Sequence, residues 1–463
     1  MQWLTLRKQI DPIAQWRIPS LAMRFACLTL ALGAALILPL SAQNQATSAE
    51  ADKVYPDARA LYLDLHEHPE LSSHETQTAA KLAGRLRELG YDVTEHVGGT
   101  GIVAVMKNGA GPVVMLRTEL DALPVEEKTG LPYASKVRTK DDKGQDTAVM
   151  HACGHDVHMA ALIGTAEIMA QTKNSWHGTL MLIGQPAEET ISGAKNMIAD
   201  GFLKRFPKPD IGVALHVGNE LPAGKVGITS GYESSNADSL RVTIYGKGGH
   251  GAMPQATVDP IVIAARTILA WQTIPSREVK PGEAVVISVG YIRGGTKNNI
   301  IPDQVELGLT VRTYQPQVRK EVLAAIARIA KGEAEAAGAP RAPEISEFES
   351  TDAVYNDPAL TRRVEGVLQS ALGKENVVNM PPTMTSEDYS VFVGQGIPSV
   401  YFDLGGADPQ RYAEAKASGT KLPSNHSPLF APDLDPALHT GITAEVAVLR
   451  NLLNGNSAAT AAK

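Results

Sequence analysis

Hydrophobic residues in the first half of the chain occur in short runs that alternate with helical patterns. Apolar and small residues at helical spacing cover residues 74–90, and Gly90 is a natural helix stop. Strands are expected in the β-rich runs at 101–105, 113–116, 179–184 and 210–217, and further helices at 156–171 and 193–200. Because strands that alternate with helices build parallel sheets, the pattern predicts an α/β fold with a largely parallel sheet.

The pattern changes over residues 233–343, where longer segments alternate between apolar and polar positions. Such alternation is typical of a sheet with one covered face. Strands are expected at 239–249, 284–295 and 303–313, with helices at 259–274 and 316–337. We therefore predict a smaller α+β domain inserted into the larger one, with the return to the larger domain at 331–343.

The α/β pattern then resumes, with a strand expected at 397–406 and a closing helix at 434–453. The larger domain is thus predicted to comprise residues 50–232 and 344–455. The last ten residues are small and polar and are expected to be a disordered tail.

The first 50 residues contain an uncharged apolar stretch at 25–40, preceded by Arg24 and followed by small and polar residues. This order is typical of a secretory signal, which we place at residues 1–42. A short membrane anchor is the alternative, although the stretch is slightly short to span a bilayer comfortably. The expectation is a periplasmic or secreted protein with no stable membrane span after processing, joined to the signal by linker-like residues 43–52.

Charge and cysteine content narrow the chemistry. The 463 residues include 43 Lys and Arg against 50 Asp and Glu, a formal net charge of −7, which argues against a nucleic-acid-binding role. The two cysteines are Cys27 and Cys153, and export would remove Cys27. A lone Cys153 cannot form an internal disulfide and is interpreted as a metal ligand or a nucleophile.

Residues 150–158 read MHACGHDVH, a cluster of possible ligands. Cys153 and His155 are two positions apart, so on an extended segment both side chains point to the same side. One zinc ion can accept both, with a thiolate at about 2.3 Å and an imidazole at about 2.1 Å. Asp156 is expected to cap the following helix or to orient a ligating histidine, and His151 and His158 are expected to support the site.

Further side chains of this kind follow the ends of several predicted strands. In an open α/β sheet, ligands bind at the carboxyl ends of the strands, so these side chains are expected to converge. They are Glu119, Asp121, Glu188, Glu189, His216 and His426. Taken singly, each histidine is a plausible hydrogen-bonded core residue, and the glutamate pair a solvated helix start. A cysteine hydrolase that uses Cys153 is another alternative, but it leaves the carboxylates and the further histidines unexplained.

Several segments occur in the order found in one known family: HEHPELSSHE, MHACGHD, QPAEE, LHV, GKGGHGAMP, NNIIP, SEDY and NHSPLF. From about residue 54 to 453 the chain resembles the M20 metallopeptidase superfamily, most closely its amidohydrolase branch of hippurate hydrolases, N-acyl-amino-acid amidohydrolases and auxin-conjugate hydrolases. The resemblance implies a two-metal catalytic domain interrupted by a smaller domain that serves as a lid and dimer interface, and hence a homodimer.

The resemblance also implies roles for individual residues. The metal ligands would be Cys153, His155, Glu189, His216 and His426, holding two divalent ions of zinc, manganese, cobalt or nickel. Glu188 would be the general base, and Asp121 would support the metal site. His250, Asn299 and Arg312 of the lid would contact the substrate. Two departures from the family are Glu119, where relatives usually carry aspartate, and Gln255, where they often carry histidine.

Amide hydrolysis needs an activated water, stabilisation of charge on the carbonyl oxygen and a proton for the leaving amine, which two metals and a free carboxylate supply. The expected activity is hydrolysis of an amide bond in small N-acyl or N-aroyl amino acids or short peptides by a metal-bound water, with Glu188 as base. The alternative is a non-catalytic, metal-dependent binding protein of the same fold. Such a protein would be expected to have lost Glu188 or a ligand.

Overall fold

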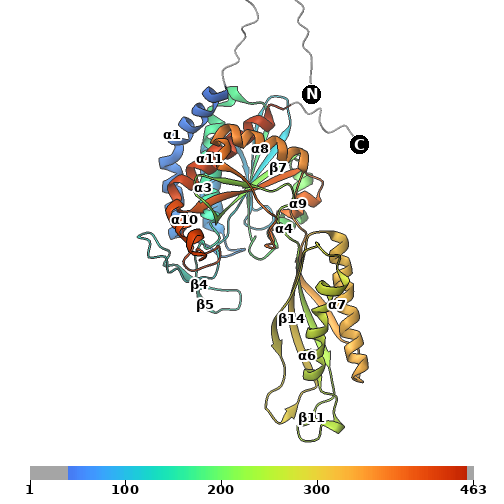
Figure 1. The fold of residues 1–463 in the computed structure, drawn as a ribbon. Coiled ribbons are helices and arrows are strands. Elements are labelled where there is room, and N and C mark those ends of the chain that lie inside the picture. Colours follow the sequence, from blue (N-terminus) through green and yellow to red (C-terminus); the bar gives the residue numbers. More distant parts are fainter. Residues whose placement is uncertain (1–39, 456–463) are drawn as a thin grey trace, which may run out of the picture.

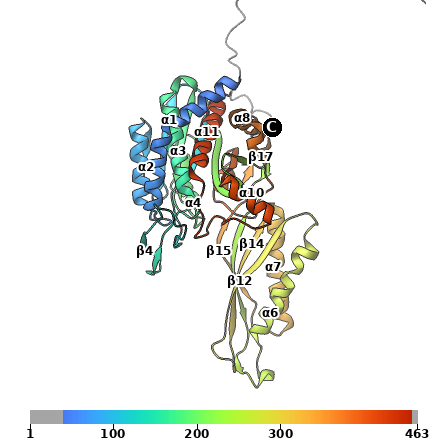
Figure 2. The ribbon, with the colours of Figure 1, turned by 60° about the vertical axis from the view of Figure 1, so that its left-hand side comes forward.

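The computed structural model describes residues 40–455, which form a larger domain and a smaller one that projects from it (Figure 1 and Figure 2). Most of the predicted signal peptide (1–42) and nearly all of the predicted tail lie outside the described residues. Within residues 40–455, no helix is both long and apolar enough to cross a membrane.

The larger domain is built on an eight-stranded sheet in the order β1-β2-β6-β3-β7-β18-β8-β17. Its central strands β6, β3, β7 and β18 run parallel, which confirms the predicted α/β class. These strands are apolar along most of their length because both faces of the sheet are covered. The bounds are Asp92–Thr94 (β1), Ile102–Asn108 (β2), Gly178–Gln185 (β6), Val113–Glu119 (β3), Ile211–Pro222 (β7), Ser399–Ala407 (β18), Val226–Ile228 (β8) and Val377–Asn379 (β17).

Helices cover the two faces of this sheet and enclose two apolar cores. One face carries α1 (Leu40–Glu67), α2 (Thr76–Glu88), α3 (His155–Gln171), α8 (Pro358–Leu372) and α11 (Leu434–Leu453). The other carries the short helices α4 (Gly193–Ala199), α5 (Phe202–Arg205) and α9 (Ser390–Gly394), and α10 (Pro409–Ser418) lies near the end of β7.

Helix α1 corrects one prediction, because residues 43–52 are helical and not a linker. The reason is burial: Ala51 and Val54 are almost fully enclosed in the core that α1 shares with α3 and α11. The sequence stretch is rich in small and polar residues, so tertiary packing decides its conformation.

The smaller domain is a four-stranded antiparallel sheet in the order β12-β14-β10-β15, packed against two helices (Figure 1). Its core includes Trp271, whose indole N–H donates to the Ile326 carbonyl at 3.0 Å between helices α6 and α7. The bounds are Ala237–Tyr245 (β10), Pro260–Trp271 (α6), Val285–Arg293 (β12), Gln304–Thr313 (β14), Pro316–Ala336 (α7) and Glu344–Thr351 (β15).

Strand β15 shifts the predicted domain boundary. It pairs with β10, so the chain returns to the larger domain after Thr351 and not at 331–343, where helix α7 is still running up to Ala336. The strand was missed because it lies at the edge of the sheet, most of its side chains are polar, and only Thr351 is buried. Three two-stranded pairs complete the fold: β4 (Arg138–Lys140) with β5 (Asp146–Ala148), β11 (Gly249–His250) with β13 (Ile300–Ile301), and β9 (Gly231–Tyr232) with β16 (Tyr355–Asn356).

The packing of α11 against α3, whose first residue is His155, includes a buried carboxyl group. Glu445 of α11 is 1% exposed and accepts a hydrogen bond from the Thr165 hydroxyl of α3 at 2.7 Å. Burial raises the pKa of Glu445 to about 8 against the lowering effect of that hydrogen bond. The carboxyl group is therefore neutral in the folded protein at pH 7 and charged in the unfolded chain.

A pKa raised by folding makes stability fall with increasing pH, from the ordinary pKa of glutamate up to the raised value near 8. We expect Glu445→Gln, which stays neutral at every pH, to be more stable than the parent at pH 8 by up to about 4 kcal/mol. The gain should vanish near pH 4. Urea unfolding at pH 4 and pH 8 measures this difference in stability. Glu321→Gln, on the exposed face of α7, is the control. An equal effect of Glu445→Gln at both pH values would contradict the expectation.

Candidate active site

The MHACGHDVH segment forms a turn that leads into α3 and places Cys153 beside His155. Gly154 precedes the helix with φ +87, a conformation that favours glycine, and a Cβ there would lie 2.4 Å from the Val217 side chain. His155 is fully buried, and its Nδ1 lies 2.8 Å from the Asp121 carbonyl oxygen. A proton on Nδ1 satisfies that contact and leaves the Nε2 lone pair free for a ligand.

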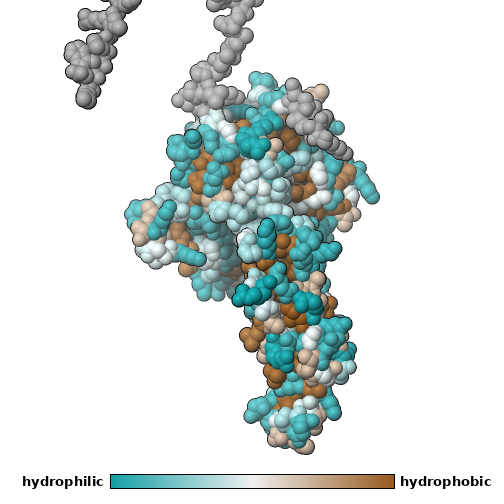
Figure 3. Space-filling view, turned by 45° about the vertical axis from the view of Figure 1, so that its right-hand side comes forward, coloured by the Kyte–Doolittle hydropathy of each residue, from teal (hydrophilic) through white to brown (hydrophobic). Residues whose placement is uncertain are grey.

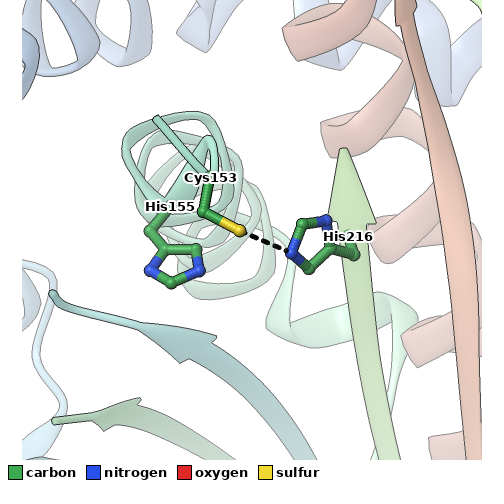
Figure 4. A group of neighbouring side chains, drawn as sticks. All are labelled: Cys153, His155 and His216. Atoms are coloured by element: carbon green, nitrogen blue, oxygen red, sulfur yellow. Dashed lines mark hydrogen bonds between the residues drawn. The ribbon is translucent and has the colours of Figure 1, made fainter. Parts of the chain in front are cut away.

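His216 reaches the same point from strand β7 (Figure 4). Its Nε2 is 3.3 Å from the Cys153 sulfur, while its Nδ1 lies 2.9 Å from the carbonyl oxygen of Val217. As in His155, Nδ1 is occupied by a backbone carbonyl, and the Nε2 lone pair of His216 is available and points toward the Cys153 thiol. Cys153, His155 and His216 therefore present three donor atoms to a common space.

Glu189 connects this group to His426. One carboxylate oxygen of Glu189 lies 3.9 Å from His155 Nε2, and the other lies 3.4 Å from His426 Nε2. His426 belongs to a distant loop, which is attached here by the hydrogen bond from its backbone N–H to the Ala152 carbonyl at 2.8 Å. The Asn425 side chain strengthens that attachment, because its amide donates to the Cys153 and Val217 carbonyls, each at 2.9 Å.

These residues fit a pair of divalent metal ions. Their donor atoms form three overlapping groups of close neighbours: Cys153, His155 and His216; Cys153, Glu189 and His426; and His155, Glu188 and Glu189. His155 Nε2 and one Glu189 oxygen are buried without a hydrogen-bond partner, which is costly unless a ligand binds there. Ligands about 2.1 Å from a shared tetrahedral ion lie roughly 3.4 Å apart, as several of these donors do.

Asp121 and His158 border the cluster. His158 forms a further close donor group with Glu119 and His155, but both of its ring nitrogens already have partners. One Asp121 oxygen accepts hydrogen bonds from the Ser72 hydroxyl at 2.6 Å and the Glu189 backbone at 2.9 Å. His158 is engaged at both nitrogens, by Glu119 at 2.8 Å and by the Val217 N–H at 2.8 Å. His151 is buried with both ring nitrogens unpaired, and burial lowers its pKa to about 4, so it is neutral. Asp156 is not the N-cap residue of α3, which is Gly154, but one of its carboxylate oxygens accepts a hydrogen bond from the Val157 N–H of the first turn at 2.9 Å. The other oxygen lies 2.6 Å from the His66 ring nitrogen.

Glu188 lies against the donor cluster and is 7% exposed. Burial and the nearby carboxylates of Glu387 and Glu189 raise the pKa of Glu188 well above its ordinary value. A carboxylate in this environment holds a proton readily, while bound cations nearby favour its charged form. Both properties suit a group that first accepts a proton and then returns it.

Sequence reasoning missed the buried Arg117, which neutralises much of this negative charge. Its guanidinium is fully buried on β3 and pairs with Glu119, with Glu387 at 2.6 Å and with Asp388 at 3.3 Å. The signal was present as an arginine inside the otherwise apolar run VVMLRTEL. A buried cation in such a run requires charged partners, which identifies the Glu387–Asp388 pair as part of the site.

A cavity of about 900 Å³ opens from the donor cluster and is lined by both domains. Arg312 of β14 lies in its wall, half-buried, and donates to the Ser386 hydroxyl. His250 and Asn299 do not line this cavity. Both are exposed at the far end of the smaller domain, where the Gly251 N–H donates to the Asn299 carbonyl at 2.9 Å (Figure 1, near β11). Gln255 lies in the same exposed region.

The chain is similar to proteins of one known family over most of its length. The sequence profile of Peptidase family M20/M25/M40 matches residues 115–419, so the chain belongs to this family. It is an enzyme of the kind that the family contains, a metal-dependent hydrolase acting on amide bonds.

Several individual proteins of this family are similar to the chain over most of its length. The chain is 37% identical over 330 residues to the N-acetyl-L-cysteine deacetylase of Bacillus subtilis, covering 71% of this chain and 76% of the relative. It is 34% identical over 371 residues to an IAA-amino acid hydrolase of Arabidopsis thaliana, covering 79% and 78%. A solved structure described as a dinuclear metal binding peptidase of the M20 family, from Bacillus subtilis, superposes with a TM-score of 0.70 at 29% identity and covers 88% of this chain and 99% of its own.

The turn at Gly154 yields a prediction about metal binding. Gly154→Ala forces a side chain into a positive-φ position and against Val217, which displaces Cys153 and His155. We expect metal affinity, measured by chelator competition, to fall by about ten- to a hundredfold. Stability of the metal-free protein should fall by about 1 kcal/mol or more.

Gly332→Ala provides the matched control, because Gly332 lies in helix α7 with open space around its Cβ position. This substitution should preserve metal affinity. Unchanged affinity in Gly154→Ala would show that the turn does not set the ligand geometry.

Proposed function

We propose that the enzyme hydrolyses the amide bond of N-acyl or N-aroyl amino acids or short peptides, with Glu188 as the general base. The observation that carries the proposal is the position of Glu188, which lies beside five metal-type donors in a cavity with a single lining cation, Arg312. The names of the relatives, a deacetylase and an amino acid conjugate hydrolase, support the same reaction class.

The proposed ligands are Cys153, His155, Glu189, His216 and His426. Two divalent ions held there supply Lewis acidity and bring the pKa of a water molecule toward neutrality. Asp121 keeps the His155 ring and the Glu189 backbone in place through the contacts described above. Because Cys153 contributes a soft sulfur ligand, later metals such as zinc are favoured.

Glu188 moves the proton in this proposal. As a carboxylate it removes a proton from the attacking water, and as a carboxylic acid it returns the proton to the leaving amine nitrogen. The buried, carboxylate-rich surroundings that raise its pKa favour the second half of this cycle. Arg312, which lines the cavity, would bind the carboxylate of the amino acid part, because a guanidinium can hold a carboxylate with two hydrogen bonds.

The two alternatives are less well supported. A cysteine hydrolase needs a thiolate, whereas burial and the carboxylates of Glu189 and Glu188 raise the pKa of the Cys153 thiol well above its ordinary value. A non-catalytic binding protein has no need of Glu188, which this chain retains together with all five proposed ligands.

Hydrolysis of hippurate, N-acetyl amino acids and dipeptides, assayed with added manganese, zinc, cobalt or nickel, tests the proposal. We expect turnover of at least one of these substrates and its loss on chelation. Glu188→Gln should lower kcat by about a thousandfold, because it removes the proton carrier, while the metal content stays the same. The absence of turnover with every substrate, or undiminished turnover in Glu188→Gln, would contradict the proposed function.

We also propose that two copies of the chain form a dimer through their smaller domains and that His250 acts on the active site of the other copy. Two observations support this. His250 lies far from the cavity of its own chain, and apolar side chains are exposed on α6 and on the edge strand β12 (Figure 3). These side chains are Ile261, Val262, Leu269 and Ile292. Exposed apolar patches of this kind mark interaction sites.

Mixing two inactive variants tests the shared site. His250→Ala and Glu188→Gln, unfolded and refolded together, should regain about a quarter of the parent activity, because half of the dimers are mixed and each mixed dimer has one intact site. Glu188→Gln mixed with Arg312→Ala is the matched control and should regain none, since both residues line the cavity of the same chain. A monomer in light scattering, or no recovery in the first mixture, would contradict the dimer proposal.

Export to the periplasm or the medium is proposed on the N-terminal sequence pattern alone. It stays a prediction, because residues 1–39 lie outside the described range.

A further inference from the structure

The active-site cavity contains more carboxylates than the proposed chemistry uses. Seven line it: Glu188, Glu189, Glu220, Glu233, Glu349, Glu387 and Asp403. Glu188 and Glu189 belong to the donor cluster, and Glu387 is held by Arg117. Glu349 accepts a hydrogen bond from the Ser239 hydroxyl at 3.0 Å and lies near Arg312. This leaves Glu220, Glu233 and Asp403 without an assigned role.

Glu233 is the most unusual of the three. It follows strand β9 where the chain crosses to the smaller domain, is 4% exposed and has a carboxylate oxygen without a hydrogen-bond partner. Its backbone is fixed at both ends, by the Val354 carbonyl at 3.0 Å and the Thr383 N–H at 2.8 Å. The side chain is therefore held in the cavity wall, where burial and the nearby carboxylates of Asp403 and Glu387 raise its pKa well above the ordinary value.

Asp403 lies on strand β18, opposite Gly227 of β8. One of its oxygens is 3.0 Å from the position that a Cβ of Gly227 would occupy, so the absence of a side chain there makes room for the carboxylate. Burial and Glu220 raise the pKa of Asp403 to about 7. Glu220 itself is exposed at the end of β7.

No cation of the protein satisfies this group. Among residues 40–455, neither Glu233 nor Asp403 forms an ion pair, and Arg312 is the single lysine or arginine in the cavity lining. Neither carboxylate belongs to any of the close donor groups suited to a metal ion. An ammonium or guanidinium group can pair with such carboxyl groups, because it donates several hydrogen bonds at about 2.8 Å in different directions.

We propose that Glu220, Glu233 and Asp403 bind a positively charged amine or guanidinium in the acyl part of the substrate. The proposal rests on the proposed function and narrows it. Arg312 would bind the carboxylate of the amino acid part elsewhere in the cavity. The enzyme would therefore favour short peptides and other aminoacyl amides over amides of neutral acids. A zwitterionic substrate offers partners at both ends of the cavity, and its positive charge favours the ionised form of these carboxyl groups. A neutral acyl group offers no such partner.

Matched substrate pairs test the charge preference. Glycyl-, β-alanyl- and 6-aminohexanoyl-methionine are compared with propanoyl-, butanoyl- and heptanoyl-methionine, which have nearly the same shapes and no positive charge. For at least one length, we expect kcat/KM to be higher for the amine by about tenfold or more. Glu233→Gln and Asp403→Asn should each reduce this ratio toward one.

The control variant is Glu414→Gln, which removes one negative charge from the exposed face of α10 and should leave the ratio unchanged. A ratio of one or less at every length in the parent enzyme would overturn the proposal. A preference for the amine substrates that persists unchanged in both Glu233→Gln and Asp403→Asn would also overturn the proposal, because other residues would then bind the positive charge.

Binding separates failure of this subsite from failure of the proposed function. Metal-loaded Glu188→Gln is titrated calorimetrically with the same substrate pairs, so that affinity is measured without turnover. Tighter binding of the amine members that is lost in the Glu188→Gln/Glu233→Gln double variant supports the subsite even if no amide is hydrolysed. Hydrolysis of the neutral substrates combined with equal binding of both members of each pair retains the proposed function and rejects the subsite.

Discussion

The arrangement of the site depends on the burial of one cation among carboxylates that would otherwise repel one another. Arg117 extends from the central strand β3 and holds Glu119, Glu387 and Asp388 in a region closed to water. The network continues through Gln185 of β6, which contacts both Arg117 and Asp388. Because a buried charge without a partner costs several kcal/mol, this network fixes the loop around residue 387 against the sheet. Glu188, which borders the donor cluster, lies next to Glu387 and Asp388 of this network.

The same loop is hydrogen-bonded to the segment that leads into the smaller domain and to Arg312 of that domain. Thr383 and Thr385 bond to the backbone of Glu233 and Ser235, where the chain leaves the sheet, and Ser386 accepts a hydrogen bond from Arg312. The segment that crosses between the domains is thus attached to the part of the active site that the buried arginine holds. Positions on both sides of the cavity are therefore connected by hydrogen bonds to one loop, residues 383–388.

The α/β fold and the sheet edge that carries the candidate site could be predicted from the sequence, because the ends of strands are local features. The apolar runs before Asp121, Glu188 and His216 identify the sheet edge at which ligands gather. Three features could not be predicted, each for a physical reason. The polar strand β15 is specified by its partner β10, the helical conformation around Ala51 by burial in the core shared with α3, and the distance of His250 from its own cavity by tertiary arrangement. The arginine inside the apolar run around residue 117 is a signal in the sequence, but the structure was needed to identify the partners of Arg117 and the burial of Glu233.

The inserted domain has a consequence for how specificity can change over evolution. It is one continuous segment, from β10 to β15, and it contributes Arg312 to the cavity. Glu220 and Asp403 belong to the large sheet, on β7, which also carries the proposed ligand His216, and on the neighbouring strand β18. Under the proposed assignments, the two ends of a substrate contact different parts of the chain. Substitutions confined to the insert can then alter recognition of one end while the residues proposed to contact the other end stay unchanged.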